Sequence, residues 1–276
     1  MGGVMARASF PHLMHKLWVD YVALNPDADK IHALLSPNAQ VENDHIALRT
    51  LDHPKINIYV LASFFEKYGF VEQDTYTFPE KKLKAKYYQH PTEPSWPKIF
   101  ISQLILDQLP KALQTLLTDK VTQIPANKLK TERLLYAGRL WSCSYDEYLA
   151  LANVSEYAAW WAALGFHANH FTVLVNSLKT KEGDEINIEQ VNQSLKLVGY
   201  QLNNYGGEIK GSKQDLLLQS ATLAYQKKMP FNDGMYSIPT CYYEFAQRFA
   251  NEDGEQFDGF VPSSADKIFQ STDRNQ

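Results

Sequence analysis

The first part of the chain carries an apolar pattern that predicts helices. Hydrophobic residues between positions 10 and 40 recur at intervals of three and four, which is the period of one helix face. These residues are Leu13, Leu17, Val19, Val22, Ile31, Leu34 and Leu35. The segment Asn25-Pro26-Asp27 interrupts the pattern, because proline breaks a helix. We therefore expect two consecutive helices before the first strand.

A strand, a helix, a hairpin and a second strand are predicted next, in that order. Residues 45–51 (HIALRTL) predict a strand, and residues 56–68 have helical spacing before Gly69, a residue typical of helix C-termini. Tyr, Phe and Lys alternate over residues 75–90, which predicts an exposed hairpin. Residues 98–106 (KIFISQLIL) predict another strand. Together these elements form a βαβββ unit.

The same order of elements returns later in the chain. Residues 170–176 (HFTVLVN) predict a strand, and residues 188–198 predict a helix that ends at Gly199. Residues 207–226 predict a hairpin, and residues 240–248 (TCYYEFAQR) predict a closing strand. The letters of the two units differ, but their pattern is shared, which indicates an internal duplication.

The predicted fold is of the α+β class. Two βαβββ units, over roughly residues 41–106 and 166–250, are expected to form a curved, barrel-like mixed sheet behind a helical N-terminus. Residues 107–165 are helical and aromatic in character, so we expect a helical insertion that covers part of the core. No stretch rich in Gly, Pro or Ser divides the chain, which predicts one domain over residues 1–276.

Composition and charge narrow the class of protein. The 276 residues are 45% hydrophobic and carry a net charge of -4, which argues against a nucleic-acid-binding surface. No apolar run approaches the ~20 residues that span a bilayer, and the N-terminal residues lack the apolar region of a secretory signal. Cys143 and Cys241 have no metal-binding spacing and are expected to be buried thiols. We therefore expect a cytoplasmic protein without nucleic-acid or membrane partners.

Three predicted strands place an ionisable side chain opposite their apolar face. Side chains alternate along a strand, so His45, His170 and Glu244 each lie on the less apolar side of their strand. If these sides line the concave surface of one sheet, two imidazoles and one carboxylate converge. Two histidines and one carboxylate form the ligand set of non-haem Fe(II) enzymes.

Each of these residues also has a purely structural interpretation. A histidine at the start of a strand, such as His45, is often only a hydrogen-bonded edge residue. Glu244 could pair with Arg248, which follows four positions later. His167 is a rival to His170 as a ligand, but its offset of three places it on the other face or in the entering loop. We favour His170 because it belongs to the regular strand.

Four segments of the chain together resemble the DUF1338 family. They are VENDHIALRTL, ANHFTVLVN, YYEFAQRF and GFVPSSADKIFQST, and they occur in the order of the family. The characterised members of this family are 2-oxoadipate dioxygenase/decarboxylases. The resemblance implies a fold related to the vicinal-oxygen-chelate proteins and an Fe(II) site whose ligands correspond to His45, His170 and Glu244.

The resemblance also implies a reaction. 2-Oxoadipate and O₂ would give 2-hydroxyglutarate and CO₂, so the expected partners are a small 2-oxo acid and O₂. The arginine four residues after the first ligand of the family corresponds to Arg49. Its guanidinium suits a substrate carboxylate, and it lies on the same strand face as His45. The alternative is an internal salt bridge from Arg49 to Glu42, Asp44 or Glu244.

Other polar and aromatic residues near these strands are also candidate site residues. Ser102 and Gln103 lie on the closing strand of the first unit, roughly where Glu244 lies in the second. Both are candidates to line the cavity, and Gln103 is the predicted second substrate contact. Tyr242 and Tyr243 flank Glu244 and are more typical of a core than of a catalytic site.

Three classes of function are consistent with these residues. The first is the iron dioxygenase. The second is a non-redox hydrolase, isomerase or lyase on the same scaffold, because the same ligands bind Zn²⁺, Mn²⁺ or Ni²⁺. The third is a small-molecule binding protein whose histidines and glutamate only contact a ligand. Metal analysis separates the third class from the others, and oxygen consumption with 2-oxoadipate separates the first from the second.

Overall fold

The structure is a computed structural model, and it describes residues 9–35 and 41–274. The predicted helical stretch at 36–40, and residues 1–8, on which the expectation about a secretory signal rests, lie outside the described residues. The two predicted N-terminal helices are confirmed as α1 (Phe10–Leu24) and α2 (Pro26–Leu35). α1 buries one stripe of side chains at helical spacing, so its position on the sheet follows from the apolar pattern.

The first unit contains the predicted elements. They are β1 (Asn43–Leu51), α3 (Ile58–Glu66), β2 (Val71–Phe78), β3 (Leu83–Gln89) and β4 (Lys98–Leu104). The expectation of an exposed hairpin is correct for β2 and wrong for β3, which is buried along most of its length. Phe260 packs against Tyr87 of β3 at 5.2 Å between ring centres, and α3 contacts the strand, so its side chains are covered by packing on the sheet.

The second unit repeats this order. It consists of β5 (Ala168–Leu174), α7 (Ile188–Leu197), β6 (Lys210–Ser212), β7 (Leu217–Ala221) and β10 (Tyr242–Arg248). The two units share one sheet with the order β2-β3-β4-β1-β5-β10-β7-β6. β1 pairs in parallel with β4, β5 pairs in parallel with β10, and β1 and β5 meet antiparallel at the centre. Counted outward from the central pair of β1 and β5, the two halves therefore have the same order of strands. This confirms the duplicated α+β fold.

A matching pair of helix caps shows the duplication at the level of side chains. The Gln103 amide oxygen on β4 accepts a hydrogen bond from the Ile58 N–H at 3.0 Å, at the start of α3. The Gln247 amide oxygen on β10 accepts one from the Ile188 N–H at 3.0 Å, at the start of α7. In both halves a glutamine of the closing strand thus satisfies a free N–H group at the first turn of the helix.

One hairpin was not predicted. β8 (Gln226–Phe231) and β9 (Gly234–Pro239) follow β7 and precede β10 in the sequence, and they form a separate two-stranded sheet. Their two-residue loop is Asn232-Asp233, directly before Gly234, which is a local hairpin signal in the sequence. The predicted hairpin over 207–226 corresponds to β6 and β7 alone.

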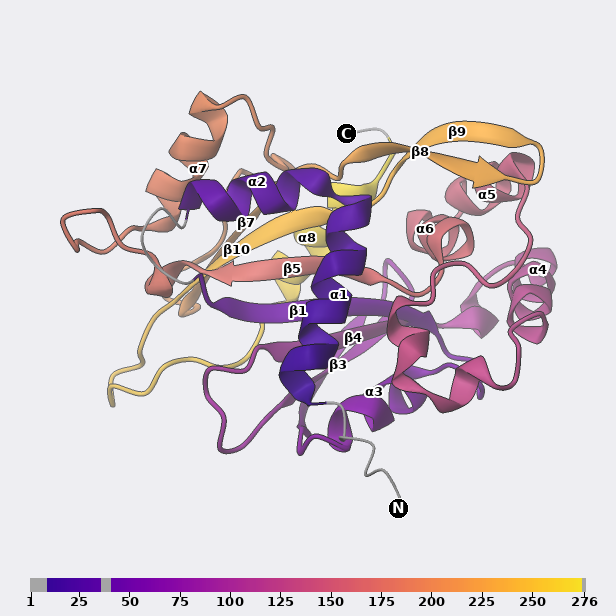
Figure 1. Cartoon of the computed structure of the whole chain (residues 1–276), viewed down its shortest axis with the longest axis horizontal. Coiled ribbons are helices and arrows are strands. Elements are labelled where there is room, and N and C mark those ends of the chain that lie inside the picture. Colours follow the sequence, from indigo (N-terminus) through magenta and orange to yellow (C-terminus); the bar gives the residue numbers. More distant parts are fainter. Residues whose placement is uncertain (1–8, 36–40, 275–276) are drawn as a thin grey trace, which may run out of the picture.

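The helices are divided between the two faces of the sheet. Figure 1 shows α1 and α2 crossing the sheet over β1, β5 and β10.

The helical insertion is confirmed as α4 (Lys111–Thr122), α5 (Tyr145–Ala152) and α6 (Glu156–Leu164). Short 3₁₀ helices are η1 (Leu106–Gln108), η2 (Lys128–Lys130), η3 (Glu132–Tyr136), η4 (Val175–Ser177) and η5 (Phe269–Thr272).

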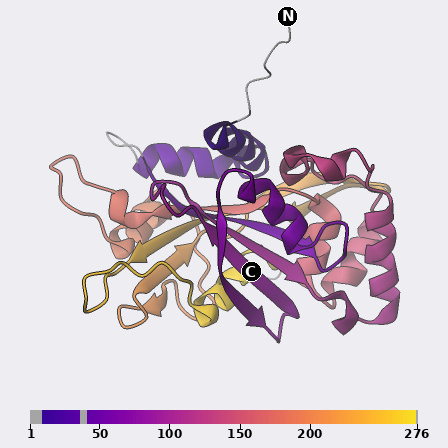
Figure 2. The same ribbon diagram turned by 90° about the horizontal axis from the view of Figure 1, so that it is seen from below.

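The C-terminal helix lies on the concave side of the sheet. α8 (Pro262–Ile268) contacts β2 at one edge and β6 and β7 at the other. Figure 2 shows it on the side opposite to α1 and α2. Because α8 touches both edges of the curled sheet, it covers the surface on which the predicted site residues lie. Among the described residues, no helix has the length and apolar character needed to cross a membrane.

Candidate metal centre

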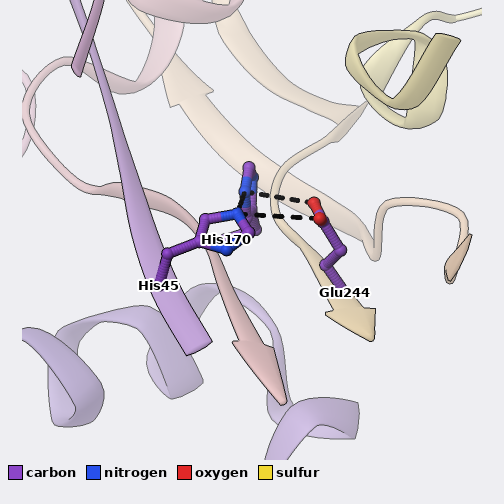
Figure 3. A group of neighbouring side chains, drawn as sticks. All are labelled: His45, His170 and Glu244. Carbon is purple, nitrogen blue, oxygen red and sulfur yellow. Dashed lines mark hydrogen bonds and ion pairs between the residues drawn. The ribbon is translucent and has the colours of Figure 1, made fainter. Parts of the chain in front are cut away.

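The structure brings His45, His170 and Glu244 together on the concave face. They lie on the neighbouring strands β1, β5 and β10 and are 2%, 4% and 1% exposed. His170 Nε2 lies 3.4 Å from His45 Nε2 and 3.2 Å from Glu244 Oε2, and His45 Nε2 lies 3.6 Å from Glu244 Oε1. Figure 3 shows both imidazoles directed at the carboxylate. The strand-face argument from the sequence therefore leads to one cluster.

The spacing of these atoms suits a divalent metal ion. Two ligands about 2.1 Å from a metal lie about 3.0–3.4 Å apart at octahedral or tetrahedral angles. The three donors are all within 4.8 Å of one another, and together they can hold a metal from one side. The alternative pairing of Glu244 with Arg248 does not occur, because Arg248 binds Asp44 instead. The residues present fit a three-ligand metal site with open positions.

Burial explains why these groups favour a cation between them. Burial, with smaller contributions from His45 and Arg49, lowers the pKa of His170 well below its usual value, so its ring is neutral. Burial also raises the pKa of Glu244, although His45 and Gln219 oppose this shift. Glu244 is 1% exposed, and no lysine or arginine of the described residues forms an ion pair with it, so a divalent ion would supply the positive charge.

His167 lies apart from this cluster. Its Nδ1 atom is 2.7 Å from Asp20 Oδ2 on α1, on the helix-covered side of the sheet. It precedes β5, and only His170 belongs to the strand and reaches the concave face. The structure therefore gives His167 a hydrogen-bond partner of its own rather than a place in the cluster.

Arg49 lies on the same strand and the same face as His45, as predicted. It is 3% exposed, and its guanidinium lies 4.9 Å from the ring centres of both Tyr157 and Trp160. It donates one hydrogen bond to Thr272 Oγ1 at 3.1 Å, while its Nε atom has no partner among the described residues. Desolvation by burial lowers the pKa of Arg49 from its ordinary value. The guanidinium is charged nonetheless, because that ordinary value lies far above neutral pH.

The alternative of an internal salt bridge to Arg49 does not hold within residues 9–35 and 41–274. No carboxylate there lies within 4.0 Å of its guanidinium. Asp44 is paired with Arg248, Glu244 belongs to the metal cluster, and Glu42 is exposed. A buried charge without a counter-ion is costly, so Arg49 is a ready binding site for an anionic group.

Two cavities lie beside the C-terminal segment. The smaller, about 20 Å³, is lined by the three ligands together with Gln219, Tyr242 and Phe260. The larger, about 160 Å³, is bordered by Arg49, with Lys81 and Asp273 on its rim. Phe269 lines both. The metal cluster and Arg49 therefore lie on either side of one aromatic ring.

Gln103 and Ser102 are placed differently from the prediction. Gln103 caps α3 on the other face of β4, so the structure gives it no contact with the cavity. The Ser102 hydroxyl binds Tyr157 Oη at 3.0 Å, below Arg49. The register His45↔Lys98 and His170↔Tyr242 makes Phe100, rather than Ser102, the residue of the first unit that is equivalent to Glu244. The first unit thus contributes only His45 to the cluster of three.

The sequence patterns do not predict several residues that contact the cluster. Tyr242 is fully buried and lines the metal cavity, its ring stacks on His170 at 4.6 Å, and its hydroxyl has no partner in the described part of the chain. Gln219 Nε2 donates to Glu244 Oε1 at 2.6 Å. Asp44 and Asn169 bind the two histidines, and the repeated polar-residue–His pair in the two strands was the available signal.

Comparison with known proteins agrees with this geometry. A family model described as 2-oxoadipate dioxygenase/decarboxylase matches residues 12–257. The chloroplastic protein of that name from Arabidopsis thaliana is 34% identical over 99% of this chain and 80% of its own length. The chloroplastic/amyloplastic protein from Oryza sativa subsp. japonica is 33% identical over 93% of this chain and 76% of its own. The crystal structure of hydroxyglutarate synthase in complex with 2-oxoadipate from Oryza sativa has a TM-score of 0.88 at 30% identity, over 100% of this chain and 98% of that one.

The fold and the ligand cluster define a duplicated βαβββ protein with a two-histidine, one-carboxylate centre. A glyoxalase-superfamily protein from Ralstonia eutropha shares this fold, with a TM-score of 0.73 at 15% identity over 90% of this chain and 84% of that one. The chain belongs to the 2-oxoadipate dioxygenase/decarboxylase family, whose members are oxidoreductases. This confirms the resemblance to DUF1338, and the comparisons do not favour the non-redox enzyme or the binding protein.

The expected cytoplasmic location is wrong. The two curated relatives are chloroplastic and chloroplastic/amyloplastic proteins. The expectation rested in part on Cys143 and Cys241, which are indeed free and buried. Free thiols indicate a reducing environment, and they do not distinguish the cytoplasm from a plastid.

Proposed function

We propose that this chain is an Fe(II)-dependent enzyme that converts 2-oxoadipate and O₂ to 2-hydroxyglutarate and CO₂. The observation that carries the proposal is the convergence of His45, His170 and Glu244 beside Arg49, a buried cation without a carboxylate partner among the described residues. The relatives named above are oxidative decarboxylases of this substrate, and the rice structure holds 2-oxoadipate. The three ligands are proposed to hold the iron.

The choice of Fe(II) rests on the chemistry of the donors. Two neutral imidazoles and one carboxylate on a single side are the set that non-haem iron oxygenases use. When bound there, iron supplies open coordination sites at which a 2-oxo acid and O₂ are held and activated. Gln219 fixes the carboxylate of Glu244 through its 2.6 Å hydrogen bond, so the ligand oxygens keep their direction.

Arg49 is proposed to select a dicarboxylate. It lies four residues along β1 from His45 on the same face of the strand, and its positive charge is close enough to contribute to the lowered pKa of His170. A substrate that reaches both the metal centre and the guanidinium must therefore be elongated and acidic at each end. The oxo-acid end would lie at the metal cluster, and the distal carboxylate would bind Arg49 through paired hydrogen bonds.

The C-terminal segment is proposed to keep this cavity dry. Phe260, Ile268 and Phe269 form an apolar cover over the three ligands. Phe260 packs edge-on against the His45 ring at 4.8 Å between centres. An apolar cover strengthens the electrostatic contacts inside and protects reactive species from water.

The oxygen electrode tests the proposal directly. Purified protein loaded anaerobically with Fe(II) should consume one O₂ for each CO₂ released when 2-oxoadipate is added, with 2-hydroxyglutarate as the organic product. A non-redox enzyme on this scaffold would consume 2-oxoadipate, or another substrate, without oxygen. Absence of oxygen uptake by fully iron-loaded protein contradicts the proposal.

Tyr242 is proposed to donate a hydrogen bond to the bound substrate. Tyr242→Phe removes only the unpartnered hydroxyl, so we expect kcat/KM to fall about three- to tenfold, the value of one neutral hydrogen bond. Iron content and melting temperature should not fall, because that hydroxyl makes no contact within the protein as described.

The neighbouring Tyr243→Phe is the matched control for this variant. Tyr243 lies on the opposite face of β10, and its hydroxyl is 3.2 Å from His32 Nδ1. We expect its removal to change stability and leave kcat/KM as in the wild type. Equal kinetics for the two variants would place Tyr242 outside the substrate site.

A further inference from the structure

Both histidine ligands are bound by the residue that directly precedes them. Asp44 Oδ1 lies 2.7 Å from His45 Nδ1, and Asn169 Oδ1 lies 3.1 Å from His170 Nδ1. Consecutive residues of a regular strand point to opposite faces, so such a contact is not available in an ordinary strand. A departure from regular pairing must bring each pair to the same side.

Two β-bulges provide that departure. The pairing of β1 with β5 passes from Asn43 to His45 and skips Asp44. It also passes from Ala168 to His170 and skips Asn169. A bulge leaves one residue out of the ladder and re-aims its side chain, which is why bulges are frequent beside active sites. Each half of the duplicated sheet therefore uses its bulge residue to fix the Nδ1 side of its ligand.

The two bulge residues differ in charge. Asp44 is 5% exposed and forms a two-pronged ion pair with Arg248, at 2.5 Å to Nε and 2.9 Å to Nη2. Asn169 is 1% exposed, and its amide nitrogen has no hydrogen-bond partner in the described part of the chain. The His45 imidazole is thus hydrogen-bonded to a carboxylate, and the His170 imidazole is hydrogen-bonded to a neutral amide.

Arg248 also ties this arrangement to the cover of the site. Its Nη1 atom donates to the carbonyl oxygens of Phe257 and Gly259, both at 2.8 Å. The next residue, Phe260, packs its ring against His45. The His45 ring is therefore held through Asp44 on one side and through Phe260 on the other, and Arg248 contacts both supports.

We propose that Asp44, fixed by Arg248, is the positioning residue for His45, and that its charge makes His45 the stronger of two unequal histidine ligands. An acceptor at Nδ1 keeps the proton there and leaves Nε2 free for the metal, and a carboxylate makes the imidazole a better donor than an amide does. This inference rests on the proposed metal site at His45, His170 and Glu244.

The test compares metal affinity with stability in three variants. Asp44→Asn makes the support of His45 resemble that of His170 but leaves Arg248 charged and buried. Asp44→Asn/Arg248→Gln removes both charges and avoids an unpaired buried cation. Asp20→Asn is the matched control, because Asp20 binds His167 at the same 2.7 Å outside the cluster. Co(II) affinity is measured by chelator competition on metal-free protein, alongside the melting temperature without metal.

We expect Co(II) to bind about 10- to 100-fold more weakly in both Asp44 variants and unchanged in Asp20→Asn. The visible spectrum of bound Co(II) should also change in the Asp44 variants, because His45 is no longer held in one orientation. A folded double variant with wild-type Co(II) affinity would overturn the proposal, even if its melting temperature were lower. If His45→Ala also kept wild-type affinity, the metal site itself would be misplaced, which distinguishes the two failures.

Discussion

Replacing His45, His170 or Glu244 by alanine is expected to abolish metal binding and turnover while the fold survives. Each residue supplies one of three donor atoms within 4.8 Å of one another, so two ligands cannot hold the ion as three do. Loss of a supporting residue already costs about 10- to 100-fold in metal affinity, so loss of a ligand should cost more than about 100-fold. Iron content by elemental analysis and secondary structure by circular dichroism check this on one preparation.

The fold should survive because the cost of burying these ionisable groups in the apo protein offsets the hydrogen bonds that they make. Burial disfavours the charged forms of both His170 and Glu244, so their removal relieves a cost of desolvation. His167→Ala is the control. It removes the hydrogen bond with Asp20 and is expected to lower the melting temperature while retaining metal. Unchanged metal stoichiometry in all three ligand variants would show that the metal is bound elsewhere.

Side-chain alternation selected the three residues that the structure brings together, and the resemblance to the DUF1338 family implied the same three residues as metal ligands. His45, His170 and Glu244 were each assigned to the polar face of a strand, and the sheet brings those faces together. The duplication supplied the rest of that inference, because two copies of one unit place equivalent strands side by side at the centre of the sheet. Periodicity and repetition are local properties of the chain, which is why they could be read without a structure.

What could not be predicted depends on register and on tertiary packing. Gln103 was assigned to the cavity because the register of β4 against β1 was unknown, and a shift of one residue moves a side chain to the opposite face. The bulges at Asp44 and Asn169 are properties of strand pairing and leave no periodic signal. The cover formed by α8 is a long-range contact between the C-terminus and both sheet edges.

Arg49→Lys is expected to lower kcat/KM for 2-oxoadipate by about ten- to a hundredfold at full iron loading. Lysine keeps the charge but loses the planar pair of donors that a carboxylate accepts, and a charge-assisted contact of this kind is worth roughly 1.5–3 kcal/mol. Arg49 has no carboxylate partner within the described residues, so the loss should appear in turnover rather than mainly in stability. Turnover, iron content and melting temperature are measured on the same preparation.

Two comparisons isolate the contact between Arg49 and the substrate. Arg139→Lys is the matched control, because Arg139 also lies over an aromatic ring, at 5.3 Å from that of Phe231, but outside the cavity. It reports the general cost of the exchange and should leave kcat/KM unchanged. A 2-oxo monocarboxylate of the same chain length lacks the distal acid, so wild type and Arg49→Lys should turn it over at similar, low rates. If Arg49→Lys instead lost as much activity toward the monocarboxylate as toward 2-oxoadipate, Arg49 would act at the oxo-acid end. Unchanged turnover of both substrates would remove Arg49 from the substrate site, and with it the structural reason for preferring a dicarboxylate.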